Sequence, residues 1–266
     1  MRTLEVRNRR LRSPVTGAGD AVVCMTTYGS RAERAHLALE SIARGRLRPR
    51  RLILWIDEEA LLADLPRAIR RLQARGLEVL RCPAYGPHNK QYPYASSLPT
   101  HVLPLVTADD DTLYPRGWLA GLVTAHRQTP DVVVGYRAHT IALDGGGLAS
   151  YAGWSPRAGT AASYRVLCTG CSGTIYPPRL VEAFGAAGTE FLKNCPRADD
   201  IWVHAVAVRN GFMSRQLGAS QVHFHLIPET QVGTLQRENV REGGNDRQIA
   251  ATYGPAEVAS IIGGPA

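Results

Sequence analysis

Apolar and polar positions alternate along the first part of the chain in the order strand, helix, strand. Apolar runs at 21–27, 52–56 and 77–80 have the length and composition of buried strands. Between them, apolar residues recur at helical spacing over 31–43 and again in the segment that ends near Gly76. This alternation predicts a mainly parallel sheet covered by helices on both faces.

The second part of the chain continues the pattern with longer interruptions. A loop rich in Pro, Tyr and Gly at 83–99 leads into an apolar run at 102–108, which predicts another strand. A helix is expected over 115–128 and a strand over 131–136. The stretch 145–160 is rich in Gly, Ala and Ser, which is typical of a mobile insertion.

The two ends are expected to lie outside a single domain that spans 21–250. Residues 1–20 carry five arginines and finish in Pro and Gly, so we expect a flexible basic arm. Such an arm is either a disordered terminus or a segment attracted to anionic lipid. Residues 251–266 are expected to form a C-terminal tail.

The charge and the aromatic content of the chain limit the classes of partner that we expect. The formal charge is +8, and only Lys90 and Lys193 among the 31 basic residues are lysine. A basic chain favours nucleotide diphosphates, a lipid-phosphate surface or nucleic acid. The arginines are dispersed and only 7% of residues are aromatic, which argues against nucleic acid. No apolar stretch has the length of a membrane span or the pattern of a signal peptide, so we expect a cytoplasmic protein.

The cysteines do not predict a disulfide framework or a metal centre. Five cysteines at irregular spacing are most simply reduced thiols. Cys168 and Cys171 form a single CxxC pair, and a structural zinc site needs four ligands.

Three consecutive aspartates, Asp109, Asp110 and Asp111, directly follow the apolar run at 102–108. Adjacent like charges repel, and hard divalent cations prefer carboxylate oxygens. The end of a buried strand is also where open α/β sheets bind ligands. The triplet therefore indicates either a cation site or a solvated acidic turn.

Three further segments carry candidate chemistry. The glycine loop at 169–174 allows a ligand to approach the backbone closely, although a plain turn has the same composition. Asp199 and Asp200 open a helical pattern, where they either stabilise the helix dipole or face a pocket as a general base. His223 and His225 would share one face of a strand, as packed or surface residues or as metal or phosphate ligands.

The order of these parts resembles a GT-A glycosyltransferase. The local sequences TADDDTLYP at 107–115, ADDIW at 198–202 and GNDRQI at 244–249 are similar to bacterial family-2-like enzymes of surface polysaccharide synthesis. The resemblance covers about residues 20–250. It implies an α/β, Rossmann-like fold with a nucleotide-binding half at 21–111 and an acceptor half at 112–250.

The resemblance also implies roles for individual residues. Asp109 and Asp111 match the DxD element that holds Mn²⁺ or Mg²⁺ on the donor diphosphate, with Asp111 as the direct ligand and Asp109 at the ribose or a metal-bound water. The adjacent Asp110 leaves the assignment within the triplet open, and His223 or His225 matches a late histidine that joins the metal or the diphosphate. Asp200 matches the general base and Asp199 its acceptor-orienting neighbour. Residues implied to contact the donor nucleotide are Thr26, Thr27, Tyr28, Arg31, Asp57, Lys90, Asp109 and Asp110. Residues implied to border the sugar and acceptor are Gly170, Cys171, Ser172, Gly173 and Trp202.

The implied activity is transfer of a sugar from a nucleotide-sugar donor, a UDP-sugar by default, to a hydroxyl of a glycan or lipid-linked acceptor. A single displacement inverts the anomeric centre. The implied localisation is the cytoplasm, with peripheral association at the inner face of the membrane. Three alternatives stay open: a sugar-phosphate nucleotidyltransferase, a non-enzymatic basic anion-binding protein, and a carboxylate–histidine metallohydrolase.

Overall fold

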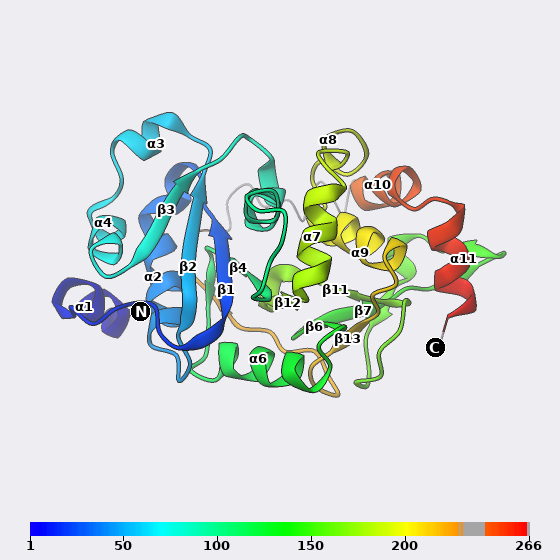
Figure 1. Cartoon of the computed structure of the whole chain (residues 1–266), viewed down its shortest axis with the longest axis horizontal. Helices are drawn as coiled ribbons and strands as arrows, with labels where there is room; N and C mark the ends of the chain where they lie inside the picture. The colour runs from blue at the N-terminus through cyan, green and yellow to red at the C-terminus, as the bar shows by residue number, and fades with distance from the viewer. Residues whose placement is uncertain (229, 231–242, 265–266) are drawn as a thin grey trace.

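A seven-stranded sheet runs through the centre of the computed structural model, which describes residues 1–228, 230 and 243–264 (Figure 1). In spatial order the strands are β13 (Ser214–Gln216), β6 (Val133–Gly135), β12 (Thr174–Tyr176), β4 (Leu105–Asp109), β1 (Gly19–Thr26), β2 (Pro49–Ile56) and β3 (Leu77–Arg81). Only β12 runs antiparallel to its neighbours in this sheet. The mainly parallel sheet predicted from the sequence is confirmed.

Helices cover both faces of this sheet because alternate residues of each central strand point to opposite sides. In β1, Val23 and Met25 belong to one buried apolar cluster, whereas Val22 and Cys24 belong to the other. The first cluster includes side chains from α2 (Ala32–Ala43), α4 (Arg67–Gln73) and α6 (Trp118–Gln128). The second includes side chains from α5 (Tyr92–Ala95), α7 (Pro178–Ala186) and α9 (Asp199–Arg209).

Short elements fill the connections between these layers. Small sheets pair β10 (Ser155–Pro156) and β11 (Val166–Cys168) with β7 (Ala138–Thr140), β14 (His225–Leu226) with β5 (Thr112–Leu113), and β8 (Leu143–Asp144) with β9 (Gly147–Leu148). The short helices are α3 (Glu59–Ala63), α8 (Phe191–Asn194) and the 3-10 turns η1 (Gly29–Arg31), η2 (Gly86–Lys90), η3 (Tyr151–Gly153) and η4 (Gly170–Ser172). The stretch 145–160, expected as a mobile insertion, therefore holds a hairpin strand, a 3-10 turn and an edge strand.

The N-terminal residues form a packed helix, so the expectation of a flexible arm over 1–20 is wrong. Helix α1 (Arg2–Arg10) buries Leu4 and Asn8 one helical turn apart, and it contacts α2 and α4. The Asn8 amide donates hydrogen bonds to Glu40 Oε1 at 3.3 Å and to the Ala68 carbonyl at 3.0 Å. Composition alone missed this helix because many arginines surround the two residues that anchor it.

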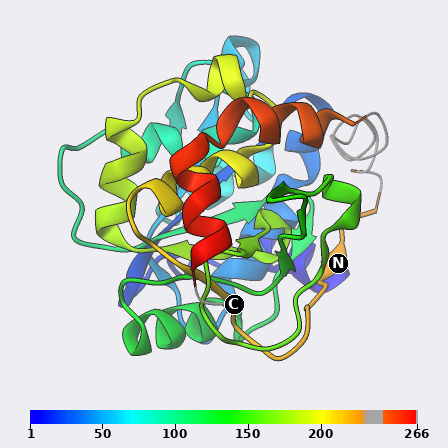
Figure 2. The ribbon, with the colours of Figure 1, turned by 90° about the vertical axis from the view of Figure 1, so that its right-hand side faces the viewer.

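The C-terminal residues are also ordered by packing, where a tail had been expected over 251–266. Helices α10 (Gly244–Thr252) and α11 (Pro255–Gly263) contact α9 and lie across the surface on that side (Figure 2). Ile261 is fully buried, and the Tyr253 hydroxyl lies 2.7 Å from His204 Nδ1 inside the core. These contacts attach the C-terminal segment to the second half of the fold.

Candidate active site

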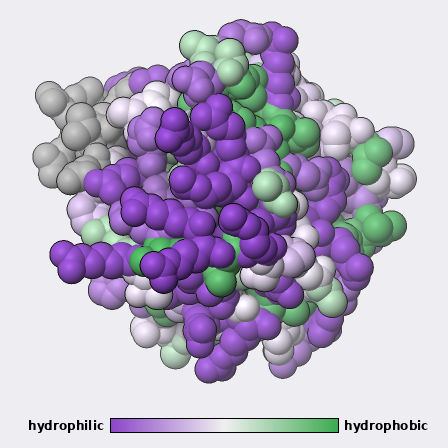
Figure 3. All heavy atoms as spheres, turned by 90° about the vertical axis from the view of Figure 1, so that its left-hand side faces the viewer, coloured by the Kyte–Doolittle hydropathy of each residue, from purple (hydrophilic) through white to green (hydrophobic). Residues whose placement is uncertain are grey.

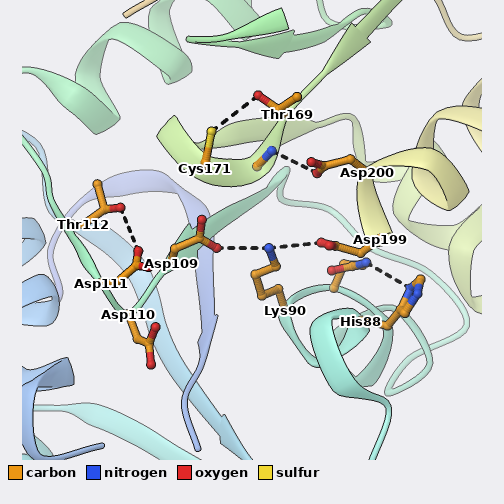
Figure 4. A network of polar contacts seen from close by, with 12 residues as sticks. His88, Lys90, Asp109, Asp110, Asp111, Thr112, Thr169, Cys171, Asp199 and Asp200 are labelled. Carbon is orange, nitrogen blue, oxygen red and sulfur yellow. Dashed lines mark hydrogen bonds and ion pairs between the residues drawn. The ribbon is translucent and has the colours of Figure 1, made fainter. Parts of the chain in front are cut away.

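The candidate residues gather at the carboxyl ends of the central parallel strands, as the fold class predicts. Thr26 ends β1, Asp57 directly follows β2, and Asp109 ends β4. Helix α9 approaches the same edge and brings Asp199 and Asp200 opposite the triplet (Figure 4). Residues that lie 90 positions apart in the sequence are thereby brought into one polar cluster.

Lys90 joins the two halves of this cluster. Its Nζ lies 3.0 Å from Asp109 Oδ1 and 3.0 Å from Asp199 Oδ2 (Figure 4). Burial alone lowers the pKa of Lys90, but the carboxylates of Asp109, Asp199 and Asp200 outweigh it and raise that pKa well above its ordinary value. The side chain therefore stays an ammonium and holds the triplet and the start of α9 together.

The other two aspartates of the triplet contact Arg31. Asp110 is buried, and its carboxylate accepts hydrogen bonds from Thr27 Oγ1 at 2.6 Å and from Arg31 Nη2 at 2.5 Å. The same Nη2 lies 2.8 Å from Asp111 Oδ2. Arg31 thus neutralises part of the repulsion within the triplet. Asp110 stabilises the loop through these buried contacts, and its expected contact with the donor nucleotide stays a prediction.

Asp200 is positioned by the glycine loop. The Gly170 backbone N–H donates a 2.9 Å hydrogen bond to Asp200 Oδ1 (Figure 4). Burial and the neighbouring Asp199 charge raise the pKa of Asp200 to about 7. A carboxylate with a pKa near neutrality can accept a proton from a hydroxyl and release it again.

The glycine loop is held against α6 by a close approach that requires glycine. Gly173 has φ +92°, and a Cβ atom there would lie 2.5 Å from Trp118 Nε1. Trp118 Nε1 also donates a 2.9 Å hydrogen bond to the Ser172 carbonyl. Trp202, expected beside the acceptor, is instead 2% exposed and packs against Phe191 and His88 in the core. The apolar ring of Trp202 is more stable away from water, and its packing holds α9 against the core.

Several side chains that are expected to line the nucleotide pocket contact other residues of the protein. Tyr28 is 46% exposed, and the Arg31 guanidinium lies 5.4 Å from the centre of its ring. Thr26 donates a 3.0 Å hydrogen bond to the Trp55 carbonyl. Asp57 accepts a 3.0 Å hydrogen bond from Asn89 Nδ2, which ties β2 to η2. Asn89 was not singled out from the sequence, although it directly precedes Lys90.

His223 and His225 are exposed, and His225 lies in β14, which pairs with β5, the strand that directly follows the triplet. His225 pairs with Leu113 in the β14–β5 ladder, and the Ile227 N–H donates a 2.6 Å hydrogen bond to the Asp111 carbonyl. The strand expected to hold both histidines contains only His225, and Phe224 lies before it with its ring centre 5.2 Å from that of Tyr136. Across the described part of the chain, no three His, Cys, Asp or Glu side chains gather in a metal-binding arrangement.

The donor set nevertheless suits a hard divalent cation that takes most of its ligands from phosphate and water. Such ions are commonly held by one or two carboxylates together with substrate phosphates. Asp109 and Asp111 supply two carboxylates that are only partly exposed, and each already lies beside a cationic side chain. The pairing with Lys90 and Arg31 shows that this edge of the sheet attracts positive charge.

Comparison with known proteins identifies the fold. No family model matches the chain, and no curated protein sequence matches it significantly. Among solved structures, it is similar to the mannosyltransferase PcManGT from Pyrobaculum calidifontis in complex with GDP-Man and Mn²⁺, with a TM-score of 0.54 and 13% identity over 98% of this chain and 74% of that one. It is also similar to S. aureus TarS residues 1–349, with a TM-score of 0.55 and 13% identity over 91% of this chain and 70% of that one. The chain therefore has a GT-A-type, Rossmann-like fold.

Proposed function

We propose that this protein is a metal-dependent glycosyltransferase that moves a sugar from a nucleotide-sugar donor to an acceptor hydroxyl with inversion. The observation that carries the proposal is the Lys90 bridge between Asp109 and Asp199. The next residue, Asp200, has a raised pKa and interacts at longer range with the same ammonium, so the bridge connects the proposed base to the aspartates suited to a diphosphate-bound cation. Similarity in fold to a mannosyltransferase bound to GDP-Man and Mn²⁺ supports this arrangement.

The chemistry follows from the placement of the carboxylates. Asp200 accepts the proton of the acceptor hydroxyl as that oxygen forms its bond to the anomeric carbon. The bond from the anomeric carbon to the diphosphate oxygen breaks on the opposite face, and the electron pair leaves with the nucleoside diphosphate. Lys90 and Arg31, which contact Asp109 and Asp111, would contact the departing phosphates. Asp109 and Asp111 would hold a divalent cation, which offsets charge on the leaving group when bound.

A thermal-shift screen tests the donor class. Ligands that bind the native state raise its melting temperature by mass action. We expect one nucleoside diphosphate and its sugar derivative to give the largest increase in the presence of Mn²⁺ or Mg²⁺, with UDP-sugars as the first choice. The same nucleotide without a divalent cation should give a smaller increase. A screen in which no nucleotide changes the melting temperature would argue against a donor site.

Product analysis separates this proposal from its alternatives. A transferase releases a nucleoside diphosphate, whereas a sugar-phosphate nucleotidyltransferase releases pyrophosphate. The turn after β1 contains a single glycine, Gly29, rather than a glycine-rich phosphate loop. A metallohydrolase would cleave the donor equally fast with and without an acceptor, so the dependence of the rate on acceptor distinguishes it.

The rate of transfer should fall as the pH drops through about 7, because Asp200 must be ionised to act as a base. Asp199→Asn removes a negative charge that raises the pKa of Asp200. The fall in rate on the acidic side of the pH profile, the acidic limb, should therefore move to lower pH. Lys90→Met removes a positive charge that lowers the same pKa, so it should move the limb to higher pH. Charged and titratable groups that interact with Asp200 are Asp199, Lys90, Asp109, Arg137, Tyr151, Tyr176 and Cys168.

The pH dependence of kcat for the three proteins checks this prediction. Shifts in opposite directions would assign the limb to Asp200 and its two neighbours. An acidic limb that stays at the same pH in both variants would assign it to another group.

A basic surface on the outer side of α1 suits peripheral association with an anionic membrane, where a lipid-linked acceptor would lie. A hollow of about 530 Å³ beside α1 and α4 is lined by Arg9, Arg34, Arg67, Arg70 and Arg71 together with acidic and neutral residues. Figure 3 shows that this face is mainly hydrophilic with scattered apolar residues. Met1 and Val6, at the start of α1 and within it, are about half exposed. None of the described helices is long and apolar enough to cross a bilayer.

The triple variant Arg2→Gln, Arg9→Gln, Arg10→Gln should lose vesicle binding, because each cation near an anionic surface contributes about 1 kcal/mol. We therefore expect a decrease in affinity on the order of 10² for phosphatidylserine-containing vesicles. The matched control replaces Arg127, Arg179 and Arg209, which are exposed on α6, α7 and α9. Equal losses in the two triple variants in a cosedimentation assay would contradict a specific role for the α1 surface.

A further inference from the structure

Arg137 is a half-buried cation whose hydrogen-bonding partners are uncharged side chains, while the Asp200 carboxylate acts on it at longer range. It lies between β6 and β7, and its carbonyl accepts a 2.9 Å hydrogen bond from the Thr169 N–H. Its Nη1 donates to Cys171 Sγ at 2.9 Å and its Nε to Gln221 Oε1 at 3.3 Å. Its Nη2 lies 3.4 Å from His139 Nε2. Within residues 1–228, 230 and 243–264, no carboxylate forms an ion pair with Arg137.

Two other arginines, whose side chains are largely buried, form ion pairs with carboxylates. Arg31 pairs with Asp110 and Asp111, and Arg75 pairs with Glu40. A guanidinium carries five N–H donors, and neutral partners such as a thiol satisfy it poorly. Asp200 acts on Arg137 only at longer range, without an ion pair, so a bound anion would satisfy N–H groups of this guanidinium that now face neutral partners.

The Arg137 guanidinium is connected to the proposed base, Asp200, through the glycine loop. Its partner Cys171 directly follows Gly170, whose amide is bound to Asp200. Tyr151 is also half-buried here, and its ring centre lies 5.9 Å from that of His139. These residues belong to the second half of the fold, and Figure 4 shows Cys171 in the glycine loop, next to the backbone that binds Asp200.

We propose that Arg137 binds an anionic group of the acceptor, a carboxylate or a phosphate, beside the glycine loop that positions Asp200. The proposal rests on the proposed function and specifies its acceptor class: a glycan that carries uronic acid or sugar-phosphate units. A planar guanidinium forms paired hydrogen bonds with either anion. Arg137 would thereby orient the acceptor hydroxyl toward Asp200 and select against neutral glycans.

The rate of alkylation of Cys171 measures anion binding at this site without an assay of sugar transfer. Cys24, Cys82, Cys168 and Cys195 are buried, whereas Cys171 is partly exposed, so mild alkylation should select it. Iodoacetate is an anion and iodoacetamide is neutral. The ratio of their rates cancels any change in the thiolate fraction and measures the attraction of an anion to the site.

In wild-type protein, iodoacetate should be favoured, and Arg137→Gln should lower the rate ratio by roughly tenfold, the smaller end of what a charge-assisted hydrogen bond provides. Inorganic phosphate should protect Cys171 in the wild type and fail to protect it in Arg137→Gln. Arg137→Lys should keep a large part of the ratio because it keeps the charge. The control Arg165→Gln, which removes an arginine bonded to the Ile141 carbonyl, should leave the ratio unchanged. A ratio and a phosphate protection that do not depend on Arg137 would overturn the anion site.

A second measurement assigns the anion to acceptor or donor. With a nucleotide sugar, the ratio of kcat/KM for a carboxylate-bearing or phosphate-bearing glycoside to that for its uncharged analogue should fall roughly ten- to a hundredfold in Arg137→Gln. Weakened binding of a nucleoside diphosphate in Arg137→Gln, with no change in that ratio, would place the anion on the donor and overturn the acceptor assignment. Absence of transfer from every nucleotide sugar would refute the proposed function, while the Cys171 labelling would still decide whether Arg137 binds an anion.

Discussion

Asp200→Asn is expected to lower the rate of sugar transfer by a factor on the order of 10² or more, because the amide cannot accept the acceptor proton. Asparagine keeps an oxygen that can accept the Gly170 hydrogen bond, so the loop geometry should survive. Donor affinity should therefore stay close to that of the wild type. The comparison variant Asp199→Asn lies in the same first turn of α9 and loses a similar interaction with the helix dipole.

The two variants separate catalysis from helix stabilisation. If the aspartates act only through the helix dipole, the variants should have similar, small effects on kcat. If Asp200 is the base, Asp200→Asn should lower kcat far more than Asp199→Asn does under saturating donor. Near-normal turnover of Asp200→Asn would remove Asp200 from this role.

The same substitution should stabilise the fold at alkaline pH. The pKa of Asp200 rises from an ordinary 3.8 to about 7 on folding, so the folded state binds a proton between these values that the unfolded state has released. The free energy of unfolding therefore decreases as the pH rises through this window. Asp200→Asn lacks the ionisation, and at pH 8 it should be more stable by roughly 1 kcal/mol or more. Melting temperatures at pH 4 and pH 8 check the sign, since the advantage should disappear at the lower pH.

Asp111→Ala should abolish the metal-dependent part of nucleotide binding, a decrease in affinity on the order of 10². Calorimetry with a nucleoside diphosphate, with and without Mn²⁺, measures that part directly. Asp110→Asn provides a control within the triplet, because Asp110 is buried against Thr27 and Arg31. It should lower the melting temperature while keeping the Mn²⁺ effect on affinity. An Mn²⁺ effect that survives in Asp111→Ala would contradict the assignment of the metal ligand.

The sequence was sufficient to predict the alternating layers and the edge of the sheet that carries the site. Apolar runs such as Leu52–Ile56 are unambiguous because both faces of a parallel strand are buried. The triplet and the start of α9 were predicted to lie in one site, and the structure brings them together through Lys90. The expected ligand roles of His223 and His225 stay predictions.

Other features depend on contacts that leave little trace in a single sequence. Helix α1 is anchored by Leu4 and Asn8, whose signal is hidden among arginines. The antiparallel strand β12 has three residues, too few to show a pattern. Arg137 meets Cys171 across 34 positions, and neither residue alone indicates the pair. Buried pairings such as Asp110 with Arg31 likewise follow from tertiary packing, and they decide which aspartates stay accessible.

The central claim is that Asp109 and Asp111 hold a divalent cation on the diphosphate of an activated sugar. Crystals grown with Mn²⁺ and the nucleoside diphosphate that gives the largest thermal shift, with data collected at the manganese absorption edge, test it most directly. We predict an anomalous peak between these two carboxylates and the diphosphate oxygens. A nucleotide bound elsewhere, or a peak remote from both carboxylates, would contradict it.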